Sequence, residues 1–128
     1  MQLGDVYYWE SDQAIGYETR SKYHVYVGEG NWIYQGHIFL FINKSNAHGG
    51  SYRITKPPYD FLKYPESYIS CNGVVPYDDG VVSSKIGDLK GRLLAPHILE
   101  LKDHILRSDE MDGHAIRLVC AGIDAGLK

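Results

Sequence analysis

The sequence predicts a small, mainly antiparallel β domain of the α+β class, in which a series of strands is followed by two helices. Short runs of aromatic and β-branched residues, separated by Gly, Asn and Pro, extend as far as Tyr77. Apolar residues recur at helical spacing only beyond Pro96. The chain has 128 residues, which suits a single domain, residues 1–128, with a core of its own.

The first strands are predicted at 6–9, 23–27 and 38–42, because each run is rich in Tyr, Val, Ile or Phe. Residues 10–20 are polar and indicate a loop, and 32–34 is a candidate for one more short strand. The connection between 23–27 and 38–42 is short, so these two strands are expected to pair antiparallel.

Three more strands are predicted in the middle of the chain. Residues 51–55 alternate between apolar and polar, and the prolines that follow at 57 and 58 end this strand. Residues 68–71 and 74–77 flank Asn72-Gly73, a dipeptide typical of tight hairpin turns. The sequence therefore predicts a hairpin formed by these last two strands.

The remainder of the chain predicts a turn and then two helices. Asp78-Asp79-Gly80 has the composition of a turn. Pro96 suits the first turn of a helix, and apolar residues mark one stripe from 98 to 106. Ser108-Asp109 interrupts this stripe and can cap a second helix, whose apolar stripe runs over 116–123. Gly126 lies at the position expected for the C-cap of this second helix.

Charge is distributed unevenly along the chain. The net charge is −3, which by itself disfavours nucleic acid as a ligand. Residues 41–63 nevertheless hold four basic residues (Lys44, Arg53, Lys56, Lys63) against Asp60, a net charge of +3. Salt screens the interaction between charges that lie more than about 8 Å apart. A local basic patch on a protein with a negative net charge can therefore still bind phosphate groups.

The two cysteines, Cys71 and Cys120, are too few for a disulfide scaffold and are expected to be buried, reduced thiols. The first residues have neither a basic nor an apolar segment typical of a signal peptide. The longest apolar run, 38–42, is far too short to span a bilayer. We therefore expect a cytoplasmic protein without a membrane partner.

The facing ends of the second and third predicted strands bring polar groups to one rim of the sheet. The groups expected to meet there are Arg20, Lys22 and His24 with Lys44, Ser45 and Asn46. Side-chain alternation puts Lys22 and His24 on one face. Cations, an imidazole and a hydroxyl at one rim indicate a phosphate-handling site. The alternative is that Lys22, His24 and Tyr26 form the solvent face of an ordinary strand.

The order of short motifs resembles the MazF/PemK family, the toxin component of type II toxin–antitoxin systems. The matching segments are Gly4-Asp5-Val6-Tyr7, Lys22 to Gly28, Asn43-Lys44-Ser45-Asn46, Ser67 to Asn72, and Ile86-Gly87-Asp88-Leu89 with the helix at 98–106. The sequence departs from the family at two points. The family's Arg-Pro pair is replaced by Lys22-Tyr23, and its catalytic Thr position falls at Lys44 or Ser45.

The resemblance implies a half-open antiparallel β-barrel with two C-terminal helices, assembled as a homodimer. It also implies a cognate antitoxin protein as a partner. The implied activity is metal-independent, sequence-selective cleavage of single-stranded RNA, with no cofactor. Such cleavage uses the 2′-hydroxyl of the substrate as the nucleophile.

The residues supply candidates for each step of that chemistry. His24 is the candidate acid or base, Lys22 stabilises charge on the phosphorane, and the Ser45 hydroxyl orients the phosphate. Aromatic and basic residues interleave between 52 and 68, a pattern that suits base stacking and backbone contacts in single-stranded RNA. The expected substrate contacts are Arg20, Lys44, Asn46, Arg53, Lys56 and Tyr59.

Two other functions are open at this point. One is a MazF-like barrel without catalysis that acts as a protein-interaction or nucleic-acid-binding module, which the two departures from the family favour. The other is a nucleic-acid-binding barrel unrelated to toxins. His24 beside Lys22 favours the endoribonuclease.

Overall fold

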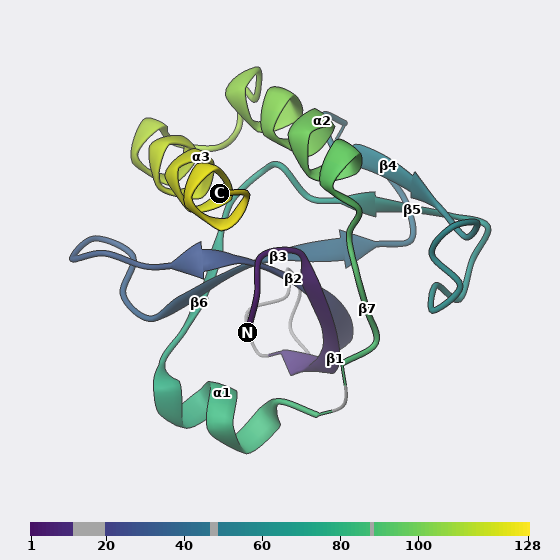
Figure 1. Cartoon of the computed structure of the whole chain (residues 1–128), viewed down its shortest axis with the longest axis horizontal. Helices are drawn as coiled ribbons and strands as arrows, with labels where there is room; N and C mark the ends of the chain where they lie inside the picture. The colour runs from purple at the N-terminus through teal and green to yellow at the C-terminus, as the bar shows by residue number, and fades with distance from the viewer. Residues whose placement is uncertain (12–19, 47–48, 88) are drawn as a thin grey trace.

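The computed structural model describes residues 1–11, 20–46, 49–87 and 89–128, and it shows an antiparallel β half-barrel with three helices (Figure 1). The strands are β1 (Asp5–Ser11), β2 (Arg20–Glu29), β3 (His37–Asn43), β4 (Tyr52–Thr55), β5 (Glu66–Ile69), β6 (Val75–Tyr77) and β7 (Gly91–Arg92). The helices are α1 (Asp79–Lys85), α2 (Ala95–Leu106) and α3 (Gly113–Gly126). The predicted α+β class and antiparallel sheet are confirmed.

The centre of the sheet is the pair β2–β3, and its antiparallel pairing is the one that the sequence predicts. The strand order is β4-β5-β3-β2-β1-β7, and β6 pairs with β3 beside this path. Tyr23 pairs with Ile42 and Val25 with Leu40, and a bulge shifts the register between Tyr26 and Gly28. Because this register is antiparallel, the start of β2 lies beside the end of β3, where the rim of polar residues is expected.

The predicted hairpin around Asn72-Gly73 is wrong. Strands β5 and β6 do not pair with each other; both pair antiparallel with β3, β5 through Ile42 and β6 through the stretch from His37 to Phe39. One edge of β3 is long enough to hold the two short strands end to end. Asn72-Gly73 therefore joins two successive segments that run in one direction. Residues 32–34, in the β2–β3 connection, form a bend rather than a strand.

The predicted turn at Asp78-Asp79-Gly80 is also wrong, because it begins the helix α1. The Asp78 carboxylate accepts a hydrogen bond from the Val81 backbone N–H at 2.8 Å and caps the helix. A helix of seven residues that includes Gly80 has little stability of its own. Its buried side chain, Val82, packs into an aromatic cluster, so tertiary packing stabilises this helix.

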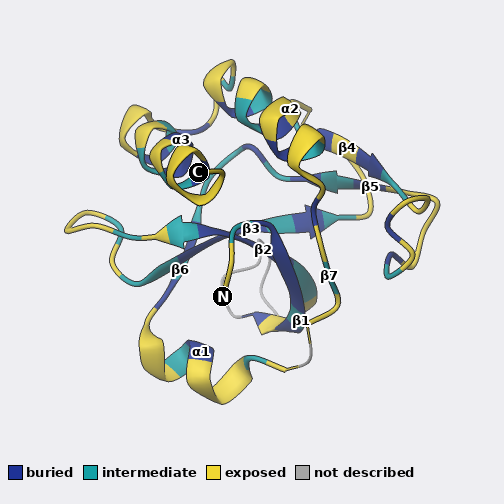
Figure 2. Cartoon of the chain, viewed as in Figure 1, coloured by how far each residue is buried: buried dark blue, intermediate teal, exposed yellow. Residues whose placement is uncertain are grey.

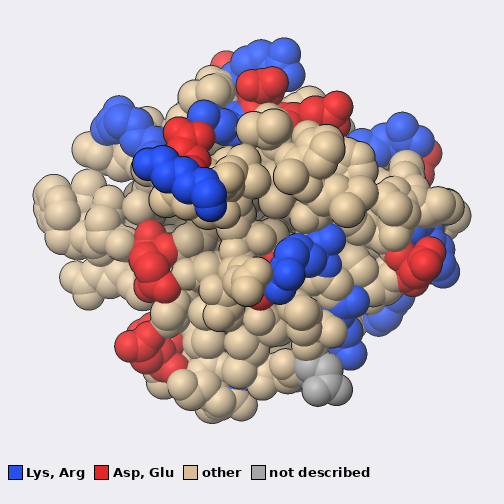
Figure 3. Space-filling model, in the orientation of Figure 1, with Lys and Arg blue, Asp and Glu red and all other residues tan. Residues whose placement is uncertain are grey.

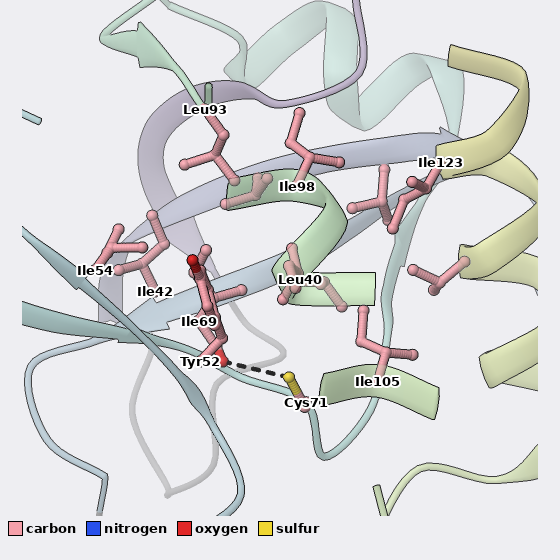
Figure 4. Close-up of a cluster of buried hydrophobic side chains, with 14 of the residues drawn as sticks. Leu40, Ile42, Tyr52, Ile54, Ile69, Cys71, Leu93, Ile98, Ile105 and Ile123 are labelled. Atoms are coloured by element: carbon pink, nitrogen blue, oxygen red, sulfur yellow. Dashed lines mark hydrogen bonds between the residues drawn. The ribbon is translucent and has the colours of Figure 1, made fainter. Parts of the chain in front are cut away.

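Both faces of the sheet are covered. The larger core lies between the sheet and the helices α2 and α3, and it includes Leu40, Ile69, Ile105 and Ile123 (Figure 4). A second, aromatic cluster lies on the α1 side and consists of Tyr7, Trp9, Tyr26, Phe39, Val75, Tyr77 and Val82. Figure 2 shows the same arrangement, with exposed outer sides on all three helices and buried strands between them. The middle residues of the two central strands, 24–27 and 38–40, are therefore buried on both faces.

The two C-terminal helices form where the sequence predicts them. Pro96 lies in the first turn of α2. The cap of α3 is Asp112, whose carboxylate accepts from the Ala115 N–H at 2.9 Å, rather than the predicted Ser108-Asp109 pair. Ser108 instead donates to the Cys71 carbonyl at 2.7 Å and fixes the connection between the helices against the sheet.

Both cysteines are buried free thiols, as expected. Burial raises the pKa of Cys71 to about 11, and its thiol donates to the Ile69 carbonyl at 3.7 Å (Figure 4). Among the described helices, none combines the length and the apolar character needed to cross a bilayer.

Candidate functional site

A pocket of about 250 Å³ lies where the start of β2, the end of β3 and the β4–β5 connection meet. We call it the basic pocket. The described residues that line it are three lysines, three tyrosines, two serines, one asparagine and one isoleucine: Lys22, Lys44, Lys63, Tyr8, Tyr23, Tyr64, Ser21, Ser67, Asn43 and Ile42. It opens at the rim where the sequence predicts a phosphate-handling site.

One wall of the pocket comes from the β2–β3 pair. Because Tyr23 pairs with Ile42, Lys22 lies opposite Asn43. The Lys22 ammonium donates to Asn43 Oδ1 at 2.5 Å and lies 5.4 Å from the centre of the Phe41 ring. This pairing holds the ammonium group at the end of the sheet, beside the pocket.

Aromatic residues form another part of the lining. The Lys63 ammonium donates to the Tyr8 hydroxyl at 2.9 Å and lies 4.6 Å from the centre of the Tyr8 ring, and this hydrogen bond raises the pKa of Lys63. The rings of Tyr8 and Tyr23 are 4.7 Å apart, and the Tyr23 hydroxyl donates to the Phe61 carbonyl at 2.8 Å. Strands β1 and β2 and the β4–β5 connection are thereby joined around the pocket.

Ser67, on β5, is the most deeply buried polar residue of the lining. It is 4% exposed, and its hydroxyl makes no hydrogen bond with any residue that the structure describes. Among the described residues, the fully enclosed side-chain polar atom that lacks a partner is Trp9 Nε1 and not the Ser67 oxygen, so the Ser67 hydroxyl keeps contact with solvent. It can therefore donate to or accept from a ligand in the pocket.

The pocket is electropositive although the whole chain has a net charge of −3. None of the described lining residues carries a carboxylate, whereas three carry an ammonium group. In Figure 3, basic side chains gather at the lower right, on the side of the β4–β5 connection, with an acidic group among them, whereas the lower left shows acidic side chains. The lining favours an anionic ligand.

Lys22 and Lys44 are the predicted site residues that the structure brings together in this pocket. Ser45 and Asn46 follow β3, are exposed and do not line it. Arg20 begins β2, but its side chain lies outside the part of the chain that the structure describes.

The other predicted substrate contacts lie away from the basic pocket. Arg53 is exposed and forms an ion pair with Glu66 at 2.7 Å, and Lys56 is exposed on the β4–β5 connection. Tyr59 is 4% exposed; its hydroxyl accepts from the Leu94 N–H at 3.0 Å and contacts His97 Nδ1 at 2.5 Å. Tyr59 is thus a core residue in this structure, with no face available for base stacking.

His24 lies in the aromatic cluster and not in the pocket. Its ring is stacked on Trp9 with the centroids 4.1 Å apart, and the residue is 0% exposed. It shares a face with Lys22, as alternation predicts, but α1 and the aromatic cluster cover that face beyond Lys22. The predicted position of His24 at an open rim therefore needs correction, because the sheet is covered on both sides.

The hydrogen bonds of His24 fix its neutral tautomer. Nδ1 lies 2.9 Å from the Lys22 carbonyl oxygen, which only accepts, so Nδ1 carries the proton. Nε2 then accepts from the Tyr77 hydroxyl at 3.0 Å, and the Tyr77 oxygen accepts from Ser11 at 2.5 Å. Burial lowers the pKa of His24 to about 4. In this structure the imidazole is therefore buried and neutral at pH 7, and it presents no exposed surface to a ligand.

Two residues of the pocket, Tyr8 and Ser67, have no signal in the sequence that assigns them to a site. Lys63 and Tyr64 belong to the interleaved aromatic and basic segment that the sequence singles out for RNA contacts. Within the described part of the chain, no group of three or more His, Cys, Asp and Glu side chains is arranged to hold a metal ion.

No family model matches the sequence, and no curated protein matches it either.

Proposed function

We propose that the protein binds single-stranded RNA in the basic pocket. The observation that carries the proposal is the convergence of Lys22, Lys44 and Lys63 with exposed Tyr64 on one pocket whose described lining has no carboxylate. Ammonium groups contact the phosphate backbone, and aromatic faces stack on unpaired bases. At about 250 Å³ the pocket is below the usual range of sites for drug-sized ligands, about 300–1,000 Å³, and suits one unpaired nucleotide.

Replacing a lysine of the pocket should weaken RNA binding. We expect Lys22→Ala and Lys63→Ala each to raise the Kd for a fluorescent ten-nucleotide RNA about tenfold at low salt, because each variant loses a phosphate contact. The slope of log Kd against log salt should also fall by about one in each variant. Fluorescence anisotropy in EDTA measures both quantities.

The control for this measurement is Lys128→Ala, which removes the same charge from an exposed terminal residue outside the pocket. It should leave the Kd within about twofold of the wild-type value, since distant charges are screened. The proposal would be contradicted if the RNA did not bind the wild-type protein at low salt. It would also be contradicted if all three variants lost affinity for the RNA equally.

A second candidate function is the metal-independent RNA cleavage that the MazF/PemK resemblance implies. The observation that favours it is that Lys22 and Ser67, which both lie in segments that match the family, line one pocket. Ammonium groups there would stabilise the charge of a phosphorane. However, the described lining has no His, Asp or Glu to transfer a proton, so we place binding without cleavage first.

An RNA cleavage assay in EDTA separates these two functions. We expect a structured and an unstructured RNA to remain intact with the wild-type protein at a concentration that saturates binding. Cleavage by the wild type that is lost in Lys22→Ala, while this variant remains folded, would instead establish the endoribonuclease. Cleavage that persists in Lys22→Ala would indicate a contaminating nuclease.

We further infer a barrel of the MazF/PemK type, a homodimer, an antitoxin partner and a cytoplasmic location from the same resemblance. The supporting features are the Gly4-Asp5 segment at the start of β1, the antiparallel half-barrel, and α2 following Ile86-Gly87. Light scattering of the purified protein tests the dimer. A small acidic protein encoded next to this chain, and its co-purification with the protein, tests the antitoxin.

A further inference from the structure

The hydrogen-bonding direction of Asn43 is fixed by its partner in the basic pocket. The Lys22 ammonium can only donate, so the atom of Asn43 that lies 2.5 Å from it is the oxygen Oδ1. The Asn43 amide nitrogen therefore points away from Lys22. Its N–H groups donate to no residue that the structure describes.

The other polar groups of the pocket are compatible with a ligand that accepts hydrogen bonds. The three lysines only donate, and the hydroxyl of Ser67 can donate or accept. The described lining residues carry no carboxylate, and their amide oxygen, Asn43 Oδ1, already accepts from Lys22. A ligand that enters the pocket therefore meets hydrogen-bond donors on Asn43 and on the lysines. The Ser67 hydroxyl can either donate to the ligand or accept from it.

We propose that the pocket selects a base with a keto oxygen, uracil or guanine, over a base with an amino group at the equivalent position, cytosine or adenine. This inference rests on the proposed binding of RNA. The Asn43 amide donates to O4 of uracil or O6 of guanine. Cytosine and adenine present an exocyclic NH₂ group there instead. Two donors that face each other leave both without a partner, which is costly in a desolvated pocket.

The comparison of oligo(U) with oligo(C) tests this selectivity, because the two ten-nucleotide RNAs have the same length and charge. We expect the Kd for oligo(U) to be about tenfold lower than for oligo(C), the usual size of one base-edge discrimination. Fluorescence anisotropy at one fixed low salt concentration in EDTA gives both values.

Asn43→Asp tests the assigned donor directly. The carboxylate keeps the size of the side chain and can still accept from Lys22, so we expect the variant to fold. It removes the amide donor, and the ratio between oligo(U) and oligo(C) should fall to about one. The matched control is Asn46→Asp, which adds the same charge at an exposed position outside the pocket. The control should weaken both RNAs equally and keep their ratio.

Asn43→Ser is the second variant and adds no charge. It should also reduce the ratio, and it replaces Asn43→Asp in the comparison if that protein does not fold. Equal Kd values of the wild type for oligo(U) and oligo(C) would overturn the inference and leave RNA binding in place, since the Asn43 amide would then contact phosphate. If neither RNA binds, the proposed function fails as well.

Discussion

Lowering the pH from 7 to 4 should reduce the free energy of unfolding by about 3 kcal/mol through His24 alone. Burial lowers the pKa of His24 to about 4 in the folded protein, against 6.5 for an exposed histidine. Between these two values the unfolded chain binds a proton and the folded protein does not. The stability that the neutral ring provides is therefore complete above pH 6.5 and is lost as the pH falls toward 4.

The size of this effect follows from the gap between the two pKa values, since each pH unit in which only the unfolded chain is protonated is worth about 1.4 kcal/mol. The surroundings of His24 explain why the folded state resists the proton. Trp9, Phe39 and Phe41 surround the ring, and the nearest charge is the ammonium of Lys22, which also disfavours an imidazolium. In the neutral ring, Nδ1 donates to the Lys22 carbonyl and Nε2 accepts from the Tyr77 hydroxyl, so both ring nitrogens have a partner without a proton being added.

Urea unfolding at several pH values between 7 and 4 measures this dependence in the wild type and in His24→Asn. The variant is expected to be less stable at pH 7, because it loses the stacking on Trp9. Its stability should nevertheless fall by about 3 kcal/mol less than that of the wild type over this pH range. The difference between the two proteins removes the contribution of carboxylates such as Asp112, whose hydrogen bond from Tyr34 lowers its pKa.

His114→Asn is the control, because His114 is an exposed histidine on α3. It should retain the full pH dependence of the wild type. If His24→Asn and the wild type lose stability in parallel down to pH 4, His24 is not buried as a neutral ring.

The pairing of β2 with β3 was predictable because it depends on local information. Two runs of β-forming residues, a short connection and alternation fix an antiparallel pair. The same reasoning predicted that Lys22 and Lys44 approach one another, and both line the basic pocket. It failed for Ser45 and Asn46, because the chain leaves the sheet after Asn43 and these two side chains lie outside the pocket.

The burial of His24 was not predictable from alternation, which identifies residues that share a face but not whether that face is covered. The rings that cover His24 come from Trp9 on β1, Phe39 on β3 and Tyr77 on β6. Helix α1 adds its one buried residue, Val82, to the same cluster, and a helix with one buried residue and a glycine in its first turn has no helical stripe in the sequence. The missed helix therefore explains the predicted turn, and the cover of aromatic side chains explains the exposed position predicted for His24.

The remaining residues of the pocket come from distant parts of the sequence. Tyr8 and Lys63 are 55 residues apart and meet through a hydrogen bond and a ring contact. Ser67 lines the pocket because β5 pairs with the end of β3. Pairings at this separation depend on the whole fold, so a single sequence shows the types of residue but not the pocket.

Gly122→Ala should destabilise the protein by about 3 kcal/mol, because helix α3 touches strand β2 through backbone atoms. A Cβ atom on Gly122 would fall well inside contact distance of the Val27 carbonyl oxygen. From the other side, a Cβ on Gly28 would lie 3.2 Å from the Gly122 Cα, and Gly28 has a φ of +128°, where other residues are strained. No flexible side chain lies between the two backbones to absorb the added methyl group.

The direction of this effect opposes helix propensity, which makes the prediction specific. Alanine in place of glycine within a helix ordinarily stabilises it by about 1 kcal/mol. Gly80→Ala in α1 is the matched control, since the nearest atom to its Cβ is an Asp78 carboxylate oxygen at an ordinary 3.4 Å. We expect Gly80→Ala to leave stability unchanged or to raise it slightly, whereas Gly122→Ala lowers it, as measured by urea unfolding at pH 7.

The contact between α3 and β2 is separate from the basic pocket, so its effect on function should be indirect. Gly122 and Gly28 do not line the basic pocket, which lies at the opposite end of β2. The Gly122→Ala protein that remains folded should therefore bind RNA with the wild-type Kd, whereas Lys22→Ala loses affinity and keeps its stability to within about 1 kcal/mol. A stable Gly122→Ala protein would mean that α3 does not contact β2 at backbone distance. Reduced RNA affinity in its folded fraction would mean that the packing of α3 determines the shape of the pocket.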